Sequence, residues 1–126
     1  MNMKPSSTIC PCGSGAPIDT CCEPFISGKA LAPTAEALMR SRYTAYALLN
    51  QDYLLDTWHR SSRPPGIKMD PATQWIRLKI LSSEHDRVEF IATYRINGKA
   101  HTLHESSRFI NEAGRWFYLG GILETG

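Results

Sequence analysis

The hydrophobic residues of this chain follow two periods, helical in the first half and alternating in the second. Between residues 34 and 49 the apolar positions recur at helical spacing: Ala35, Leu38, Met39, Tyr46 and Leu49. Arg42 falls on the same stripe and interrupts it. Thr34 suits the N-cap, and Glu36 lies in the first turn, where the helix dipole favours an acidic residue. The pattern therefore predicts a helix over 34–49 with one charged residue among its apolar positions.

A second helical segment is predicted over 52–59. It has to end before Arg63-Pro64-Pro65-Gly66, because the prolines lack the backbone N–H that a helix interior needs. Asp70-Pro71 could open one more short helical turn, since proline is favoured at the first helical position.

After residue 75 the period changes to two, which predicts strands over 76–81, 87–96, 99–110 and 115–119. Asn97-Gly98 is a strong signal for a two-residue type I′ hairpin turn, and residues 111–114 turn the chain again. Helices followed by an antiparallel meander predict an α+β fold with the helices packed on one face of the sheet.

The predicted hairpin fixes which side chains share a face of the sheet. If Ile96 pairs with Lys99, then Ala92 faces Leu103 and Phe90 faces Glu105. Glu105 then lies on the apolar face, where an unpaired carboxylate would be costly to bury. Arg42 is the natural partner, so we predict that Arg42 and Glu105 approach each other inside the domain, directly or through water.

Length and composition fit one ordinary domain with a small appendage: 126 residues, of which 42% are hydrophobic. We predict a cysteine-containing segment over 1–26, a linker over 27–33 and the main domain over 34–126. Residues 1–6 are not followed by the apolar stretch of a signal peptide, and no run reaches the length of a membrane span. We therefore expect a cytoplasmic protein without a membrane partner.

All four cysteines of the chain, Cys10, Cys12, Cys21 and Cys22, lie in one short stretch. Two close pairs that flank a glycine-rich turn are a suitable ligand set for one Zn²⁺ ion, which takes four thiolates in a tetrahedron. Disulfides are typical of secreted proteins, which this chain does not resemble. Redox chemistry at Cys10-Pro11-Cys12 and inert thiols remain as alternatives, although the first leaves the second pair unexplained.

A zinc–tetrathiolate centre has consequences for charge and folding. Its charge of −2 needs nearby donors, and Gly13-Ser14-Gly15 can turn tightly and aim backbone N–H groups at the sulfurs. It also offsets the formal net charge of +2, which leaves about zero and, without clustered basic residues, argues against nucleic-acid binding. The segment is too short and polar for a core of its own, so we expect metal to fold it.

Several segments together resemble a known family. Cys10-Pro11-Cys12-Gly13-Ser14-Gly15, followed by Cys21-Cys22, is similar to the SEC-C motif, a zinc-binding segment of the bacterial secretion motor SecA. Residues 33–43, 53–59, 103–109 and 114–118 resemble the YchJ family of uncharacterised bacterial proteins. The resemblance implies a cystatin-like, nuclear transport factor 2 (NTF2)-like cone of helices on a curved sheet. SEC-C motifs usually carry lysines before the second cysteine pair, whereas residues 16–20 have no positive charge, so the basic partner-binding surface does not carry over.

Two functions follow as hypotheses. The first is a binding or protein-interaction module that contains zinc and acts as a monomer or weak dimer. The alternative is a small-molecule enzyme of the isomerase or dehydratase type, because cones of this shape host such reactions in other families. Its pocket would gather a set of polar and aromatic side chains: Arg42, Tyr43, Trp58, His59, Tyr94 and Glu105. Tyr43, Trp58 and Tyr94 also suit core packing, and His59 suits a helix cap or the surface.

Overall fold

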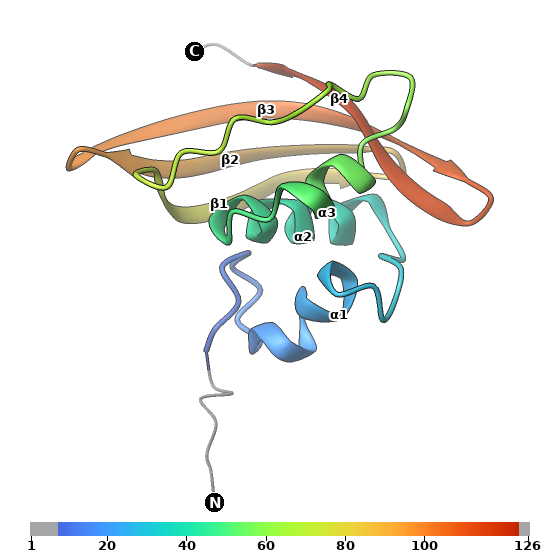
Figure 1. Cartoon of the computed structure of the whole chain (residues 1–126), viewed down its shortest axis with the longest axis horizontal. Helices are drawn as coiled ribbons and strands as arrows, with labels where there is room; N and C mark the ends of the chain where they lie inside the picture. The colour runs from blue at the N-terminus through green and yellow to red at the C-terminus, as the bar shows by residue number, and fades with distance from the viewer. Residues whose placement is uncertain (1–7, 124–126) are drawn as a thin grey trace, which may run out of the picture.

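The computed structural model describes residues 8–123, so the ends of the predicted segments at 1–7 and 124–126 lie outside the described residues. Two short helices come first, the 3₁₀ helix η1 (Ile18–Thr20) and α1 (Glu23–Ile26), and they are followed by α2 (Ala35–Ala47) and α3 (Gln51–Asp56). Four strands complete the chain: β1 (Gln74–Glu84), β2 (Arg87–Ile96), β3 (Lys99–Glu112) and β4 (Arg115–Leu123). Figure 1 shows α2 and α3 on one face of the sheet, with α1 and the cysteine-containing segment beneath α2. The predicted α+β class is confirmed.

Helix α2 forms where the apolar spacing predicts it. The Thr34 side chain accepts a hydrogen bond from the Ala37 N–H at 3.0 Å and so caps the helix. Leu49, at φ 60°, turns the chain, and the Asn50 side chain then caps α3 by accepting from the Tyr53 N–H. Among the described residues no helix has the length and apolarity to span a bilayer.

Helix α3 ends at Asp56, three residues earlier than predicted. The following residues instead pair with β4: the Tyr118 N–H donates to the Thr57 carbonyl, and the His59 N–H donates to the Tyr118 carbonyl, each at 2.8 Å. Asp70-Pro71 forms a turn rather than a helix, because the Asp70 side chain accepts from the Ala72 N–H two residues on. Pairing with a distant strand and a local side-chain bond thus replace the predicted helical turns.

The sheet is antiparallel with strand order β1-β2-β3-β4. The predicted register is confirmed, with Ile96 opposite Lys99, Ala92 opposite Leu103 and Phe90 opposite Glu105. Asn97 and Gly98 both have positive φ, as a type I′ turn requires. Strands β1, β3 and β4 extend beyond their predicted ends, and the predicted turn over 111–114 shortens to Ala113 and Gly114, because Glu112 pairs with Arg115. Irregularities in register within the β1–β2 and β3–β4 pairs accompany the curvature of the sheet.

The core lies between α2 and the concave face of the sheet. Its most buried apolar side chains come from α2, α3 and the inner strands: Leu38, Leu54, Val88 and Phe109. Cys10, Cys12 and Cys22 belong to the same buried cluster, with at most 2% of their surface exposed. The cysteine-containing segment therefore has no separate core and packs directly on the main domain.

Candidate functional site

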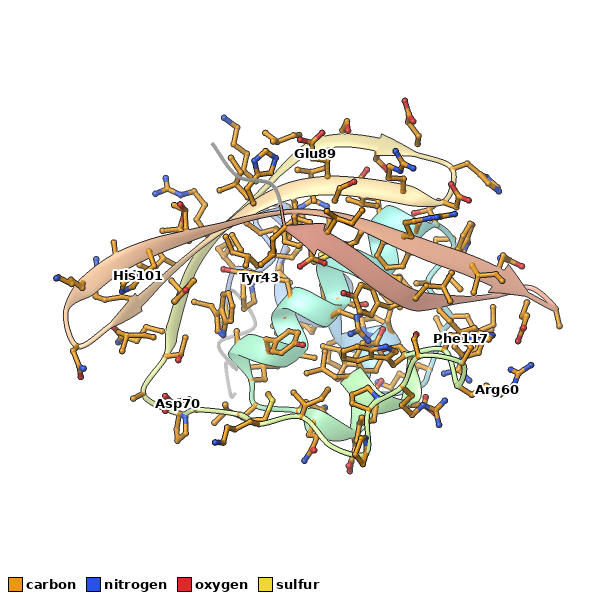
Figure 2. The ribbon with its side chains drawn as sticks, turned by 90° about the horizontal axis from the view of Figure 1, so that it is seen from above. Tyr43, Arg60, Asp70, Glu89, His101 and Phe117 are labelled. Carbon is orange, nitrogen blue, oxygen red and sulfur yellow. The ribbon has the colours of Figure 1, made fainter. Side chains whose placement is uncertain are left out.

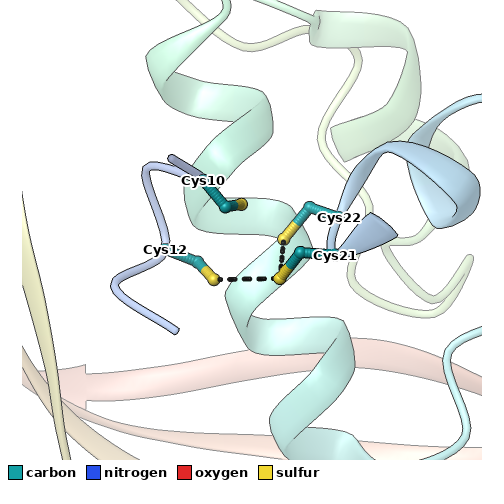
Figure 3. A group of neighbouring side chains, drawn as sticks. All are labelled: Cys10, Cys12, Cys21 and Cys22. Atoms are coloured by element: carbon teal, nitrogen blue, oxygen red, sulfur yellow. Dashed lines mark hydrogen bonds between the residues drawn. The ribbon is translucent and has the colours of Figure 1, made fainter. Parts of the chain in front are cut away.

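The four cysteine sulfurs converge on one point beside α2 (Figure 3). All four Sγ atoms lie within 4.8 Å of one another, with Cys12 and Cys21 at 3.6 Å and Cys21 and Cys22 at 4.0 Å. None is in a disulfide. Four sulfurs about 2.3 Å from a tetrahedral zinc ion stand about 3.8 Å apart, so the spacing of this donor set fits such an ion. The cluster is thus compatible with metal binding without rearrangement of the chain.

The turn between the cysteine pairs depends on two glycines. Gly13 and Gly15 have φ values of 84° and 89°, a region that residues with a Cβ seldom adopt. The Cys10 N–H donates to the Ala16 carbonyl across this turn, and residues 9 and 17 form an isolated bridge. A Cβ on Gly13 would lie 3.2 Å from the Leu78 carbonyl oxygen, so the turn also packs closely against β1.

Hydroxyl groups surround the sulfurs. Thr44 Oγ1, on α2, donates to Cys22 Sγ at 3.4 Å and lies 3.5 Å from Cys10 Sγ. Ser14 Oγ lies 3.1 Å from Cys21 Sγ. Hydrogen bonds from the side chain and backbone N–H of Ser14 also help to lower the pKa of Cys12. The glycine turn thus places Ser14 beside the sulfurs, whereas the contribution of Thr44 could not be inferred from local sequence.

The electrostatics of the cluster favour thiolate at one sulfur. Hydrogen bonds, first from Cys10 and then from Cys22, lower the pKa of Cys12, and the same network raises the pKa of Cys22. Arg40 donates from Nη1 to the Cys12 carbonyl at 2.8 Å and from Nε to Glu36. Burial acts against the charge of Arg40, but Glu36 and Cys12 outweigh it and raise its pKa. A fixed cation thus stands beside a cluster that would carry −2 with a divalent ion.

A cavity of about 230 Å³ lies on the other side of α2, between the helix and the sheet. Three of the predicted pocket residues line it, namely Arg42, Tyr43 and Glu105. Figure 2, a view onto the sheet, shows Tyr43 near the middle of the molecule. The rest of the lining is mostly apolar or aromatic: Met39, Tyr46, Trp75, Phe90, Ala92, Leu103, Ser107 and Tyr118.

Glu105 faces this cavity, as the register predicts. Its Oε2 accepts hydrogen bonds from Ser107 Oγ at 2.6 Å and from Tyr118 Oη at 3.1 Å. The carboxylate passes directly over Gly121 on β4, where an added Cβ would collide with it. Burial and, next, the charge of Glu105 raise the pKa of Tyr118, so this phenol stays a donor.

Arg42 reaches the same cavity but does not form a direct ion pair with Glu105. Its Nη1 donates to the Leu54 carbonyl at 2.8 Å and to Thr57 Oγ1 at 2.7 Å. Its Cζ lies 4.3 Å from the centroid of the Tyr118 ring, a cation–π contact. Tyr118 therefore stands between the two charges. The predicted proximity takes the form of a shared cavity, with burial lowering the pKa of Arg42.

The other three predicted pocket residues lie elsewhere. Trp58 packs edge-on against Tyr118, with ring centroids 4.9 Å apart. Tyr94 is not part of the cavity lining; it stacks on His101 and contacts Trp75. His59 is buried, with Nε2 2.9 Å from Glu112 Oε2 and Nδ1 2.8 Å from Ser61 Oγ. The expected cap or surface position of His59 is therefore wrong, because α3 ends at Asp56 and the residues after it pair with β4.

Sequence reasoning did not place Tyr46, Trp75 and Tyr118 in the cavity. Tyr46 was on the predicted stripe and offered a signal. Tyr118 offered no such signal. The pairing of β3 with β4 shifts in register between Arg108 and Phe109, so the alternation of residues along β4 does not predict which side chains Tyr118 contacts.

Comparison with known proteins matches most of the chain. The family model described as "YchJ, middle NTF2-like domain" matches residues 34–121. A UPF0225 protein from Cupriavidus metallidurans is 50% identical over 90% of this chain and 88% of its own length, and one from Deinococcus radiodurans is 46% identical over 87% and 85%.

Two solved structures share the fold. The solution structure of a SEC-C motif containing protein from Rhodopseudomonas palustris has a TM-score of 0.80 and 35% identity, and it covers 94% of this chain and 100% of that chain. A crystal structure of a SEC-C motif containing protein from Psychrobacter arcticus has a TM-score of 0.73 at 21% identity, over 96% and 85%. The second likeness concerns the fold alone.

Proposed function

The chain belongs to the YchJ family of NTF2-like proteins with a SEC-C motif, and we propose that it is a zinc-stabilised binding module. The observation that carries the proposal is the convergence of four free thiols beside α2 at the spacing of a tetrahedral site. Thiolate ligands favour zinc over the harder divalent ions that prefer oxygen. Free thiols of this kind persist in a reducing compartment, so we place the protein in the cytoplasm.

The proposed role of the zinc is structural rather than catalytic. Catalytic zinc sites keep a coordination position open for water or substrate, whereas four cysteines fill the tetrahedron. Three of the four cysteines are buried, which leaves little access for a reactant. Cys10, Cys12, Cys21 and Cys22 would hold the ion, while Thr44 and Ser14 donate to sulfur and Arg40 offsets the negative charge.

The binding role is supported by the position of α2 between the cysteine cluster and the cavity. Thr44 contacts two of the cysteines, and Arg42, two residues earlier on the same helix, lines the cavity. A metal ion that fixes the outer side of α2 therefore also fixes the roof of the cavity. The proposed ligand site is this cavity, which has an aromatic lining and a few polar groups, as small-molecule sites do.

The alternative of an isomerase or dehydratase is favoured only by Glu105, whose carboxylate faces the cavity. A second group that exchanges protons near neutral pH would strengthen this alternative, because general acid–base catalysis is most efficient with such a pKa. His59, the expected candidate, contacts Glu112 and Ser61 away from the cavity lining. Burial raises the pKa of Tyr46 and Tyr118, which keeps both phenols protonated. Binding is therefore the function that we put forward.

The zinc content of the purified protein tests the proposal. We expect one zinc ion per chain, and cobalt substitution should give the intense thiolate-to-metal absorption of a four-sulfur site. A Cys21→Ser/Cys22→Ser variant should lose the metal and unfold at a lower temperature. Ser27→Ala, a small change in the same segment beyond the cluster, should keep the metal and the unfolding temperature of the wild type. A protein that retains no zinc and whose stability a chelator does not change would refute the proposal.

A search for ligands uses the wild type and the Cys21→Ser/Cys22→Ser variant. A thermal-shift screen of metabolites tests the cavity, and capture of proteins from a bacterial lysate tests a protein partner. Binding that depends on the zinc-loaded form supports the module. Turnover of a metabolite by the wild type, abolished in Glu105→Gln, would instead favour the enzyme.

A further inference from the structure

Arg42 brings a buried positive charge to the cavity with unused hydrogen-bonding capacity. Only 3% of the residue is exposed, and its hydrogen bonds to other groups within residues 8–123 all leave from Nη1. Its guanidinium has no carboxylate within ion-pair distance in the described part of the chain. The Nε and Nη2 edge, the side of the guanidinium that binds a carboxylate through two parallel bonds, is thus left without an acceptor.

The nitrogens of this free edge are not completely covered by packed atoms. Across the described residues, the fully buried polar side-chain atoms without a partner are Tyr43 Oη and Trp58 Nε1, and no atom of Arg42 is among them. The cavity that Arg42 lines is the space between α2 and the sheet. Because arginine does not release its proton in proteins, its free edge favours an anionic acceptor in that cavity in addition to Glu105, which is not within ion-pair distance of it.

Glu105 supplies the complementary group in the same cavity. Both of its hydrogen bonds, from Ser107 and Tyr118, reach Oε2, and Oε1 accepts none from the residues between 8 and 123. The carboxylate is held in this position by two donors and by the space that Gly121 leaves for it. Oε1 can therefore accept a hydrogen bond from a hydroxyl or amino group of a ligand.

The size and walls of the cavity restrict the body of the ligand. Trp75, Phe90 and Leu103 give it apolar walls. A cavity of about 150 Å³ is enough to bind benzene, whereas sites for drug-sized ligands begin at roughly 300 Å³. The observed 230 Å³ therefore suits one aromatic ring with two small substituents.

We propose that this cavity binds a small aromatic acid whose carboxylate lies on the free edge of Arg42 and whose hydroxyl or amino group donates to Glu105. A phosphate is disfavoured, because a dianion would be repelled by Glu105, whereas a planar carboxylate matches the guanidinium edge. This inference rests on the proposed binding function and specifies its ligand class.

Three probes separate the parts of the proposal in a ¹H–¹⁵N NMR titration of the zinc-loaded protein. 3-Hydroxybenzoate has both polar groups, benzoate lacks the donor, and 3-hydroxybenzyl alcohol lacks the carboxylate. We expect saturable shifts at the Trp75 indole N–H, binding of 3-hydroxybenzoate at least tenfold tighter than that of the neutral alcohol, and several-fold tighter than that of benzoate.

Two variants keep the test sharp. Glu105→Gln should remove most of the preference for 3-hydroxybenzoate over benzoate, while Glu89→Gln, the same change outside the cavity lining, should leave it intact. Leu103→Trp fills the cavity without removing a polar group and should abolish binding of all three probes. Leu103 is only half-buried, so this variant is expected to fold.

Equal affinity for the acid and the alcohol, absence of saturable shifts with any probe, or unchanged binding in folded Leu103→Trp would overturn the inference. Zinc content is measured on the same samples. A protein that holds zinc but no probe overturns the ligand class alone, whereas one without zinc refutes the proposed function itself.

Discussion

Gly121→Ala is the substitution that most directly tests how Glu105 is held. Gly121 pairs with Ser107 on β3 and has no positive φ, so its backbone accepts an alanine. The added Cβ would nevertheless overlap the Glu105 carboxylate. Glu105 must therefore move, and in moving it gives up the hydrogen bonds from Ser107 and Tyr118.

Two opposing effects set the magnitude. The overlap involves the far end of a flexible side chain beside a cavity, so rotation relieves it, and the cost comes mainly from the lost hydrogen bonds to a charged group, about 1.5–3 kcal/mol. Replacing glycine by alanine at a compatible position stabilises by about 0.4–1 kcal/mol, because the unfolded chain loses freedom. We therefore expect Gly121→Ala to lower the free energy of unfolding by about 1–3 kcal/mol, which is a fall of several degrees in Tm for a domain of this size.

Gly120→Ala provides the matched control, since its Cβ would meet no atom within 4 Å. This neighbouring change should be neutral or stabilise by up to about 1 kcal/mol. Denaturant unfolding of zinc-loaded protein measures both variants. In a Glu105→Ala background the collision is absent, so Gly121→Ala should become as mild as Gly120→Ala, with a coupling energy of about 2 kcal/mol.

The reasoning is refuted if Gly121→Ala is as mild as Gly120→Ala in the wild-type background. It is refuted equally if the cost of Gly121→Ala persists after Glu105 is removed, because the strain would then arise elsewhere in β4.

Two further substitutions test the metal centre and a buried phenol. Thr44→Val keeps shape but removes the hydroxyl beside Cys22, so zinc affinity measured by chelator competition should fall about tenfold or more, and an unchanged affinity would contradict this role. Tyr43→Phe removes a buried hydroxyl that has no partner among the described residues, so its unfolding free energy at pH 7 should equal or exceed that of the wild type. Burial raises the pKa of Tyr43 to about 12, above its unfolded value near 10. The stability that depends on keeping Tyr43 protonated is therefore fully present below pH 10 and is lost as the pH rises towards 12. Tyr43→Phe removes this ionisation, so it should weaken the loss of stability at alkaline pH.

The sequence predicted those features that depend on local chemistry. Asn97-Gly98 selects a type I′ turn, and strict alternation then fixes the register, so the residues alone place Glu105 opposite Phe90. The cysteine cluster was predictable for a similar reason, since its four ligands lie within 13 residues around two glycines.

Features that depend on contacts between distant segments escaped prediction. Residues 57–59 leave the helical path because β4 pairs with them, and nothing near His59 in sequence indicates that partner. The same pairing brings Tyr118 between Arg42 and Glu105, which replaces a direct ion pair by a cation–π contact and a hydrogen bond. A tyrosine in a strand beyond a register shift carries no local sign of either role.

The interruption of the α2 stripe by Arg42 has its explanation in the surroundings of the helix. An amphipathic helix on a protein surface buries one face, but residues 41–45 of α2 are all buried. The helix is enclosed on two sides, by the sheet and by the cysteine-containing segment, as Figure 1 shows. Residues two apart point in roughly opposite directions on a helix, so Thr44 faces the sulfurs while Arg42 faces the cavity. Each side of α2 thus presents a polar residue to its own site, and the zinc ion proposed for one side would, by fixing the helix, also fix the position of Arg42 on the other.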